Sequence, residues 1–187
     1  MSGTDLGRLD RLIAEALDER ELDYERTHEG AFFVTLPGVH KQATQVWLVV
    51  GDHSLLVEAF VVRRPDENHA EFARYLLEKN ARTYGVHFAV DPVGDVYLVG
   101  RTPLAAVTAD EVDRLLGCVL TYADESFDAL LELGFASSIR REWAWRVKRG
   151  ESLANLRAFA KFADPATSGH SADPATSGQS ADPSEEG

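Results

Sequence analysis

The stretch 46–82 constrains the fold more than any other part of the chain. Two apolar segments, 45–50 and 54–62, are separated there by a tight Gly51-Asp52 turn. Two such segments joined by a short turn predict an antiparallel hairpin. Their apolar character is nearly continuous, which is typical of strands that are covered on both faces. A basic corner and an amphipathic helix follow, so the stretch predicts a sheet with helices packed against it.

The rest of the chain extends this pattern in both directions. Apolar residues recur at helical spacing near the N-terminus, and short apolar runs bounded by turn residues indicate more strands. The predicted order is a helix at 4–17, strands at 24–27, 31–36, 45–50 and 54–62, a helix at 66–82, strands at 86–90 and 95–101, and a helix from 109. Asp66 is the expected N-cap of the middle helix. Hairpin connections predict an α+β fold with a mainly antiparallel β-sheet and helices packed on it.

The helix that follows Thr108 is the longest predicted element. Thr108 and Glu111 form a capping box, and an apolar stripe continues to Gly134, the expected stop of the helix. About 25 helical residues at 1.5 Å each span roughly 37 Å. Because this is long for one domain, we expect the helix either to cross the whole sheet or to reach beyond it to a partner.

Beyond Gly134 the sequence predicts a helical extension and then a tail. A separate helix is expected at 137–149, and Ser152 is expected to cap a last short helix. From residue 163, ADPATSGHS recurs as ADPATSGQS, and small polar repeats bury too little surface to offset the entropy of ordering. This segment is interpreted as a disordered spacer or as a freely drifting expansion. The predicted organisation is an α+β domain at 1–135, a helical extension packed on it at 136–162, and the repeat tail at 163–187.

The charge pattern argues against nucleic acid as a partner. The net charge is −12, whereas proteins that bind DNA or RNA nonspecifically need basic surfaces. The charge is uneven, since residues 140–149 hold five bases and one acid while residues 163–187 hold five acids and no base. Cys118 is the single cysteine, so no internal disulfide forms, and we expect it in the core. No apolar run suggests a membrane span or a secretory signal, which predicts a cytoplasmic protein.

The chain carries no motif of a known catalytic or metal site. Nucleophile-elbow, phosphate-loop and dinucleotide-binding patterns are absent, as are the common zinc templates. His69 and Glu71 match half of a deaminase signature, but the cysteine half is missing. We therefore expect no catalytic residue, no metal and no cofactor, and a protein that is not an enzyme.

Charged residues near the hairpin form a candidate ligand site. Glu58 is the one charge inside an apolar strand and needs a partner, for which Arg63, Arg64 and Arg101 are candidates. A structural ion pair or a position at the sheet edge would explain Glu58 as well as a polar site would. Arg63 and Arg64 precede a helix N-terminus, a combination that favours phosphate or carboxylate ligands. The alternative is that these arginines pair with nearby acids such as Asp66.

The segment 137–149 is the predicted protein-binding surface. On a helix, Ile139, Trp143 and Val147 share one face, which is expected to dock on the core, while Trp145 points elsewhere among basic residues. Cation–π contacts can hold such a ring, and Trp and Arg dominate interface hot spots. The alternatives are a helix that balances the acidic body or contacts the tail, and a nucleic-acid stacking surface, which the overall acidity disfavours. The predicted binding residues are Arg140, Arg141, Trp145, Lys148 and Arg149.

Several segments, in the same order, resemble the YbjN-like family in the form seen in actinobacteria. The resemblance covers about residues 5–160 and fails only in the repeat tail. It is carried by VWLVVGDHSLLVEAFVVRRPDENHAEF, YGVHFAVDPVGDVYLVGRTPL, the helix after Thr108, and GFASSIRREWAWRVKRGESLANL. This resemblance implies the fold of the type III secretion chaperones, in which helices pack against an antiparallel sheet.

The resemblance also implies a small cytoplasmic binding protein. The family is loosely described as a sensory transduction regulator, with no established enzymatic activity, cofactor or catalytic residues that could be carried over. We therefore predict a non-enzymatic regulator or chaperone-like module that binds a protein client of unknown identity and forms a homodimer. Neither nucleic acid nor a membrane is an expected partner. The alternative is a small-ligand or anion sensor that uses the corner formed by Arg63 and Arg64.

Overall fold

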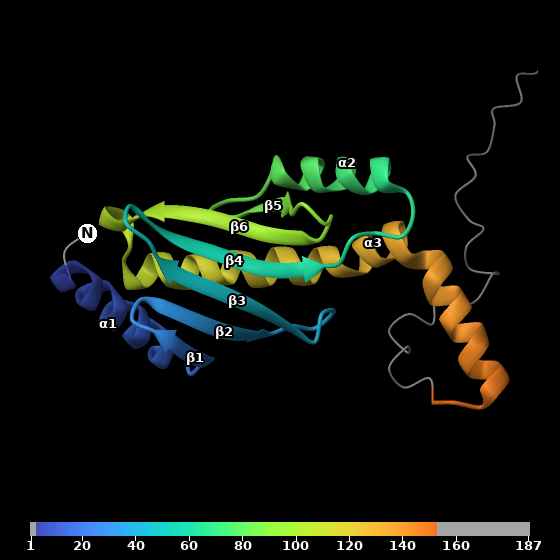
Figure 1. Ribbon diagram of the computed structural model, residues 1–187, viewed down its shortest axis with the longest axis horizontal. Helices are drawn as coiled ribbons and strands as arrows, with labels where there is room; N and C mark the ends of the chain where they lie inside the picture. Colours follow the sequence, from blue (N-terminus) through green and yellow to red (C-terminus); the bar gives the residue numbers. More distant parts are fainter. Residues whose placement is uncertain (1–2, 153–187) are drawn as a thin grey trace, which may run out of the picture.

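A computed structural model describes residues 3–152, which form a six-stranded antiparallel sheet and three α-helices (Figure 1). The elements are α1 (Gly3–Glu19), β1 (Asp23–His28), β2 (Ala31–Pro37), β3 (Ala43–Val50), β4 (Ser54–Val62), α2 (His69–Asn80), β5 (His87–Val90), β6 (Val96–Pro103), a 3-10 turn (Leu104–Ala106) and α3 (Ala109–Arg149). The strand order is β1-β2-β3-β4-β6-β5. The predicted α+β class is confirmed. The repeat tail and the helix expected after Ser152 lie outside the described residues.

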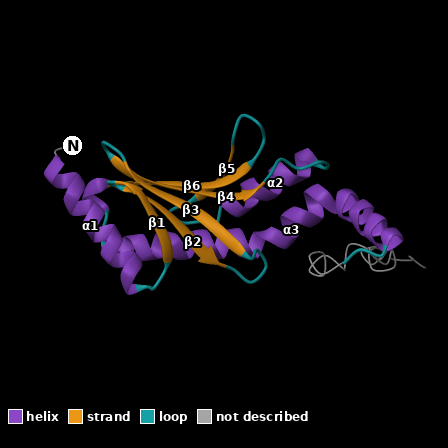
Figure 2. Ribbon diagram, turned by 60° about the horizontal axis from the view of Figure 1, so that its bottom comes forward, coloured by secondary structure: helices purple, strands orange, loops and turns teal. Residues whose placement is uncertain are grey.

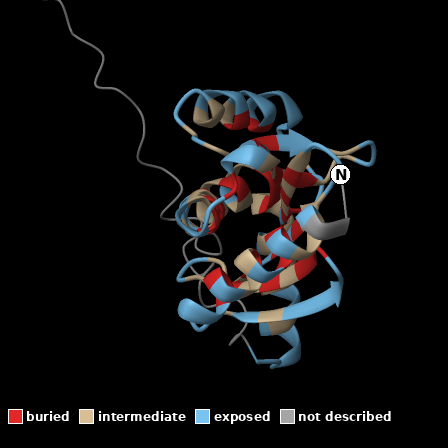
Figure 3. Ribbon diagram, turned by 90° about the vertical axis from the view of Figure 1, so that its left-hand side faces the viewer, coloured by how far each residue is buried: buried red, intermediate tan, exposed pale blue. Residues whose placement is uncertain are grey.

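The three helices lie on the same side of the sheet (Figure 2). Strand side chains alternate between two faces, and the ones on the helix side are buried between the two layers (Figure 3). This places the core in one contiguous slab. Its fully buried members include Ile13, Phe32, Val57, Leu98, Leu115 and Val119.

The prediction that the central strands are covered on both faces is wrong. In β4, Val57 and Ala59 are buried, whereas Glu58 is half-buried and Phe60 is 40% exposed. Antiparallel sheets can leave one face to solvent because hairpins, unlike crossover helices, do not cover it. The continuous apolar run therefore reflects an apolar outer face.

The N-cap of α2 is Asn68, two residues after the predicted Asp66. Asn68 has a left-handed backbone (φ 54°), and its side chain makes no capping bond to α2. Its Nδ2 instead donates to the Leu133 carbonyl of α3 at 3.0 Å. A contact with a distant helix has replaced the local cap.

Helix α3 is continuous over 41 residues, so the predicted stop at Gly134 and the separate helix at 137–149 are wrong. The predicted start is confirmed, because the Glu111 N–H donates to Thr108 Oγ1 at 3.1 Å. A Cβ at Gly134 would lie 2.8 Å from the Pro65 Cβ and 2.9 Å from the Phe72 Cε2. Glycine is needed here for close packing and not to end the helix. Figures 1 and 2 show α3 changing direction beyond the end of the sheet.

Candidate binding surfaces

The sheet face opposite the helices is an aromatic surface that sequence reasoning missed. Trp47 is 37% and Phe60 40% exposed. Ring centres lie 4.8 Å apart for Phe33 and Trp47, and 5.6 Å apart for Phe60 and Tyr97. Contiguous exposed apolar surface of this kind marks interaction sites. We call it the open face; it consists of Phe33, Trp47, Val49, Leu56, Glu58, Phe60, Tyr97 and Val99.

The edges of the sheet are less suited to binding than its face. At β5, the Asn80 side chain receives the Phe88 N–H at 2.7 Å and donates to the Phe88 carbonyl at 3.0 Å. These backbone groups are therefore occupied and cannot pair with an added strand. At the other edge, β1 carries charged side chains and a register irregularity between Arg26 and His28. Both features discourage strand addition.

The loop between β2 and β3 fixes one end of the open face. Asp124 Oδ1 on α3 accepts hydrogen bonds of 2.9 Å from the backbone N–H groups of Val39, His40 and Lys41. Burial acts to raise the pKa of Asp124, but these three donors hold it below its ordinary value. Lys41 Nζ donates to the Phe60 carbonyl at 2.5 Å and lies 5.5 Å from the centre of the Phe60 ring. Burial lowers the pKa of Lys41 to about 8.

The predicted protein-binding residues lie on the last turns of α3, which project past the sheet (Figure 1). We call residues 137–149 the basic arm. Within the described residues, Ile139 packs against the core as predicted, whereas Val147 is 56% exposed. The boundary predicted after residue 135 falls inside α3, close to its change of direction. The basic arm therefore extends an existing helix, and the division into a domain, a packed extension at 136–162 and a tail stays a prediction.

Contacts within the basic arm hold its side chains in place. Arg140, Arg141, Trp145, Lys148 and Arg149 are exposed. The Arg149 guanidinium lies 4.4 Å from the Trp145 ring centre, which is the predicted kind of cation–π contact. Arg141 instead donates to Ser138 Oγ at 2.9 Å, and Arg140 reaches Ser137 Oγ at 3.4 Å. Their role in binding stays a prediction.

Arg63 and Arg64 have different surroundings in the structure. Arg63 donates to both carboxylate oxygens of Asp66, at 2.7 and 2.8 Å, and its guanidinium lies 4.5 Å from the Phe135 ring centre. The Arg64 side chain lies beside Gly94. Arg63 thus makes the pairing with Asp66 that the sequence left as an alternative to anion binding. Ligand binding at this corner stays a prediction.

The loop between β4 and α2, residues 63–68, forms hydrogen bonds to α3 at the place where α3 changes direction. The N–H groups of Asp66 and Glu67 donate to the Gly134 carbonyl at 2.9 and 3.2 Å. The loop thereby satisfies carbonyl groups near residue 134, together with the Asn68 bond to Leu133. Carbonyl oxygens inside an α-helix ordinarily accept from the N–H four residues on. External donors at this place fit a local distortion of the helix.

The same loop supplies acceptors to the turn that follows. Glu67 accepts the Ser137 N–H and the Ser137 hydroxyl, both at 2.7 Å, and Asp66 accepts the Ser138 hydroxyl at 2.7 Å. The Arg63 side chain and then Ser138 hold the pKa of Asp66 well below its usual range. The Ser137 N–H and hydroxyl likewise lower the pKa of Glu67. Glu67 thus accepts a backbone N–H at the start of the basic arm, and Asp66 contacts the next side chain.

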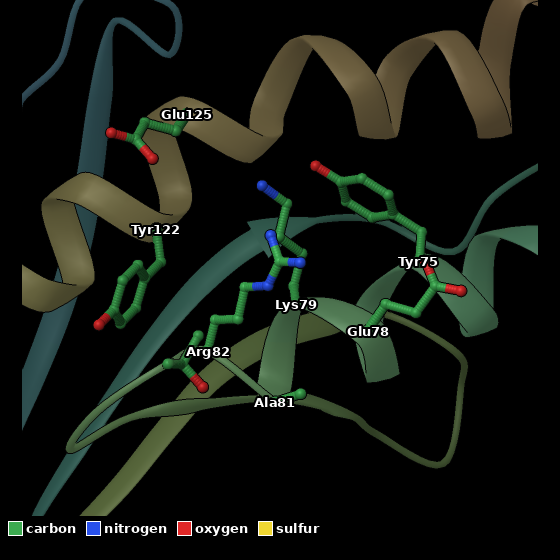
Figure 4. Close-up of a pocket in the computed structure, with 8 residues that line it drawn as sticks. Tyr75, Glu78, Lys79, Ala81, Arg82, Tyr122 and Glu125 are labelled. Atoms are coloured by element: carbon green, nitrogen blue, oxygen red, sulfur yellow. The ribbon is translucent and has the colours of Figure 1, made fainter.

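A cleft of about 580 Å³ lies between α2 and α3 (Figure 4). Lys79 and Arg82, at and just beyond the end of α2, border it together with Glu78 and with Tyr122 and Glu125 of α3. Its charges have both signs, so they indicate no single class of ligand. Among residues 3–152, no three metal-ligating side chains come together. Among the same residues, no helix has the length and apolarity needed to span a membrane.

The family model YbjN, described as "Putative bacterial sensory transduction regulator", matches residues 10–132. The chain belongs to the YbjN family. This YbjN chain is also 53% identical over 160 residues to an uncharacterized protein of Mycobacterium tuberculosis, a match that covers 83% of this chain and 87% of that protein. The resemblance drawn from the sequence is thereby confirmed.

The YbjN fold is shared with solved structures of low sequence identity. The match to a chain of the ExsC–ExsE complex has a TM-score of 0.50 and 22% identity, and covers 67% of this chain and 95% of that one. The match to the ExoU–SpcU complex from the type III secretion system of Pseudomonas aeruginosa has a TM-score of 0.45 and 16% identity, and covers 65% and 96%. The fold is that of the type III secretion chaperones. At these identities the likeness concerns the fold alone.

Proposed function

We propose that the chain is a non-enzymatic protein-binding module, regulatory or chaperone-like, and that its client binds the open face. The observation that carries the proposal is the exposure of Trp47 and Phe60 on a sheet face that no helix of residues 3–152 covers. Large apolar groups in water are costly. A partner that covers them recovers this free energy.

The rigid position of its aromatic side chains favours the open face over the other surfaces as the client-binding site. Its aromatic side chains come from β2, β3, β4 and β6, which are central strands tied to neighbours on both sides. Aromatic side chains on such a scaffold lose little conformational entropy when a partner binds. The likeness to the ExsC–ExsE complex, whose solved form contains two different proteins, agrees with a protein client.

The test is quantitative affinity capture from the native host with the full chain as bait. A variant with Trp47→Gln and Phe60→Gln should lose the client, whereas Leu77→Gln should retain it. Leu77 is 70% exposed on α2, on the helix side of the sheet, so this control removes a comparable apolar side chain elsewhere. The purified client should then bind wild type directly in calorimetry. An unchanged set of captured proteins in the open-face variant would refute the proposal.

A further inference from the structure

Glu58 lies at the centre of the open face. The strand registers place Phe33 opposite Trp47, Trp47 opposite Glu58, and Glu58 opposite Val99. The row therefore crosses β2, β3, β4 and β6 with one carboxylate inside it. Glu58 is half-buried although it lies on the outer face. Its direct cross-strand neighbours are the apolar side chains of Trp47 and Val99, and Arg101 lies in the next row.

The candidate partners of Glu58 are engaged or placed elsewhere. Within residues 3–152, no hydrogen bond or ion pair reaches its carboxylate, contrary to the expected structural ion pair. Arg63 bonds to Asp66, and Arg101 lies opposite Leu56 in the next row of the sheet. Glu58 is on β4, an inner strand, so a position at the sheet edge does not explain it either.

Two aromatic pairs border this carboxylate, one in its own row of the sheet and one in the next row. Phe33 and Trp47 form one pair on β2 and β3, and Phe60 and Tyr97 form the other on β4 and β6. Burial and then the negative charges of its surroundings, Glu58 among them, raise the pKa of Tyr97. Aromatic faces next to a carboxylate form a setting in which a cation is favoured.

Covering the open face would remove water from Glu58. A buried carboxylate without a partner is strongly unfavourable, so a wholly apolar client would bind poorly. A client that brings a guanidinium or ammonium group pairs the charge and can place its apolar neighbours on the aromatic rings. Arginine suits the site best because its planar group binds a carboxylate through two hydrogen bonds and also stacks on aromatic rings.

We propose that the open face selects an apolar protein segment that carries a central basic residue, and that this residue pairs with Glu58. The proposal rests on the proposed function and adds the chemistry of the client. Glu58 is then the specificity determinant, since it excludes purely apolar and acidic segments. Arg101 and Lys41 lie toward opposite ends of the surface and leave the negative charge at its centre.

The test is selection of random peptides displayed on phage against the immobilised full chain. Wild type should enrich apolar peptides that contain arginine or lysine. A selected peptide should bind Glu58→Gln roughly tenfold more weakly or worse, and its counterpart with glutamate in place of the basic residue should bind Glu58→Lys better than wild type. Glu78→Lys, a charge reversal on exposed α2, should bind the original peptide like wild type.

The outcomes separate this inference from the proposed function. Selected peptides that need Trp47 but show no basic preference, and that bind Glu58→Gln unchanged, overturn the inference and leave the proposed function standing. Glu58 would then prevent two copies from stacking through their open faces. Light scattering would in that case show that Glu58→Gln self-associates. Wild-type self-association that Trp47→Gln abolishes makes a second copy the occupant and also overturns the inference. If no enriched peptide depends on Trp47, both proposals fail.

Discussion

Glu67 holds Ser137 through two hydrogen bonds of 2.7 Å, one from the backbone N–H to Oε1 and one from the hydroxyl to Oε2. The two residues are 70 positions apart in the chain. This contact ties the corner between β4 and α2 to the place where α3 changes direction. The direction of the basic arm therefore depends on a loop that belongs to the sheet domain.

Loss of the Glu67 carboxylate should destabilise the fold. Glu67→Ala leaves the Ser137 N–H without its charged acceptor, which should lower the free energy of unfolding by about 1–2 kcal/mol. Urea denaturation followed by circular dichroism measures this change. Glu71→Ala, at an exposed acid in the first turn of α2, should cost much less. Equal losses in the two variants would mean that the contact contributes nothing specific.

The contacts that Asp66 and Glu67 make with α3 should also make the protein sensitive to acid. The pKa values of Asp66 and Glu67 are lower in the folded state than the ordinary carboxyl values near 4. Their stabilisation is present above those ordinary values and is lost as the pH falls toward the folded values. Between about pH 5 and pH 3, wild type should lose stability more steeply than the Asp66→Asn, Glu67→Gln variant. If urea titrations show that wild type and variant lose the same stability between pH 5 and pH 3, the prediction is contradicted.

Two glycines of α3 should respond to alanine in opposite ways. Gly134→Ala inserts a methyl group against Pro65 and Phe72 and should cost about 1–3 kcal/mol. Gly117→Ala meets no atom within 4 Å and should stabilise the protein by roughly 0.5–1 kcal/mol through helix propensity. Thermal unfolding of both variants gives the comparison. Stabilisation by Gly134→Ala would show that the neighbouring side chains move aside.

Lys41 should make stability increase at alkaline pH. Its folded pKa of about 8 lies below its ordinary value, so the unfolded chain binds more protons between these values. The free energy of unfolding then rises with pH between about pH 8 and pH 10 by this contribution. Lys41→Met lacks this amine. The free energy of unfolding of wild type should therefore increase relative to that of the variant over that range. Chemical denaturation at several pH values tests it, and a constant difference would exclude the effect.

The basic arm as a client surface has its own test. Arg141 and Trp145 are exposed, so Trp145→Ala with Arg141→Glu should leave the free energy of unfolding within about 0.5 kcal/mol. If the sequence-based prediction holds, this double variant loses the client in the capture experiment. Capture that survives the double change removes the basic arm from the binding surface and leaves the open face.

Sequence reasoning succeeded where the signal is local. The Gly51-Asp52 turn, the strand predicted at 95–101 and the helix start at Thr108 each involve residues a few positions apart, and all three formed as predicted. The cation–π contact in the basic arm belongs to the same class, because Trp145 and Arg149 lie one helical turn apart. The position of each element and the antiparallel α+β class follow from such patterns.

Sequence reasoning failed where one residue type serves two purposes. Gly134 has the features of a helix stop, but Pro65 and Phe72 pack against it and the helix continues. Asp66 has the features of a cap for α2, yet it binds Arg63 and Ser138. The packing at Gly134 and the bond from Ser138 to Asp66 depend on segments more than 60 residues away, about which local propensity contains no information.

The sequence by itself determined the strands and where the three helices lie along the chain up to Gly134, because the spacing of apolar, turn and capping residues sets local conformation. Only the tertiary structure decided which sheet face the helices cover. Apolar side chains occupy both faces of β4, so their pattern is the same whether a helix of the chain or a partner covers them. The open face and the unpaired Glu58 within it became visible only when the helices were placed on one side of the sheet.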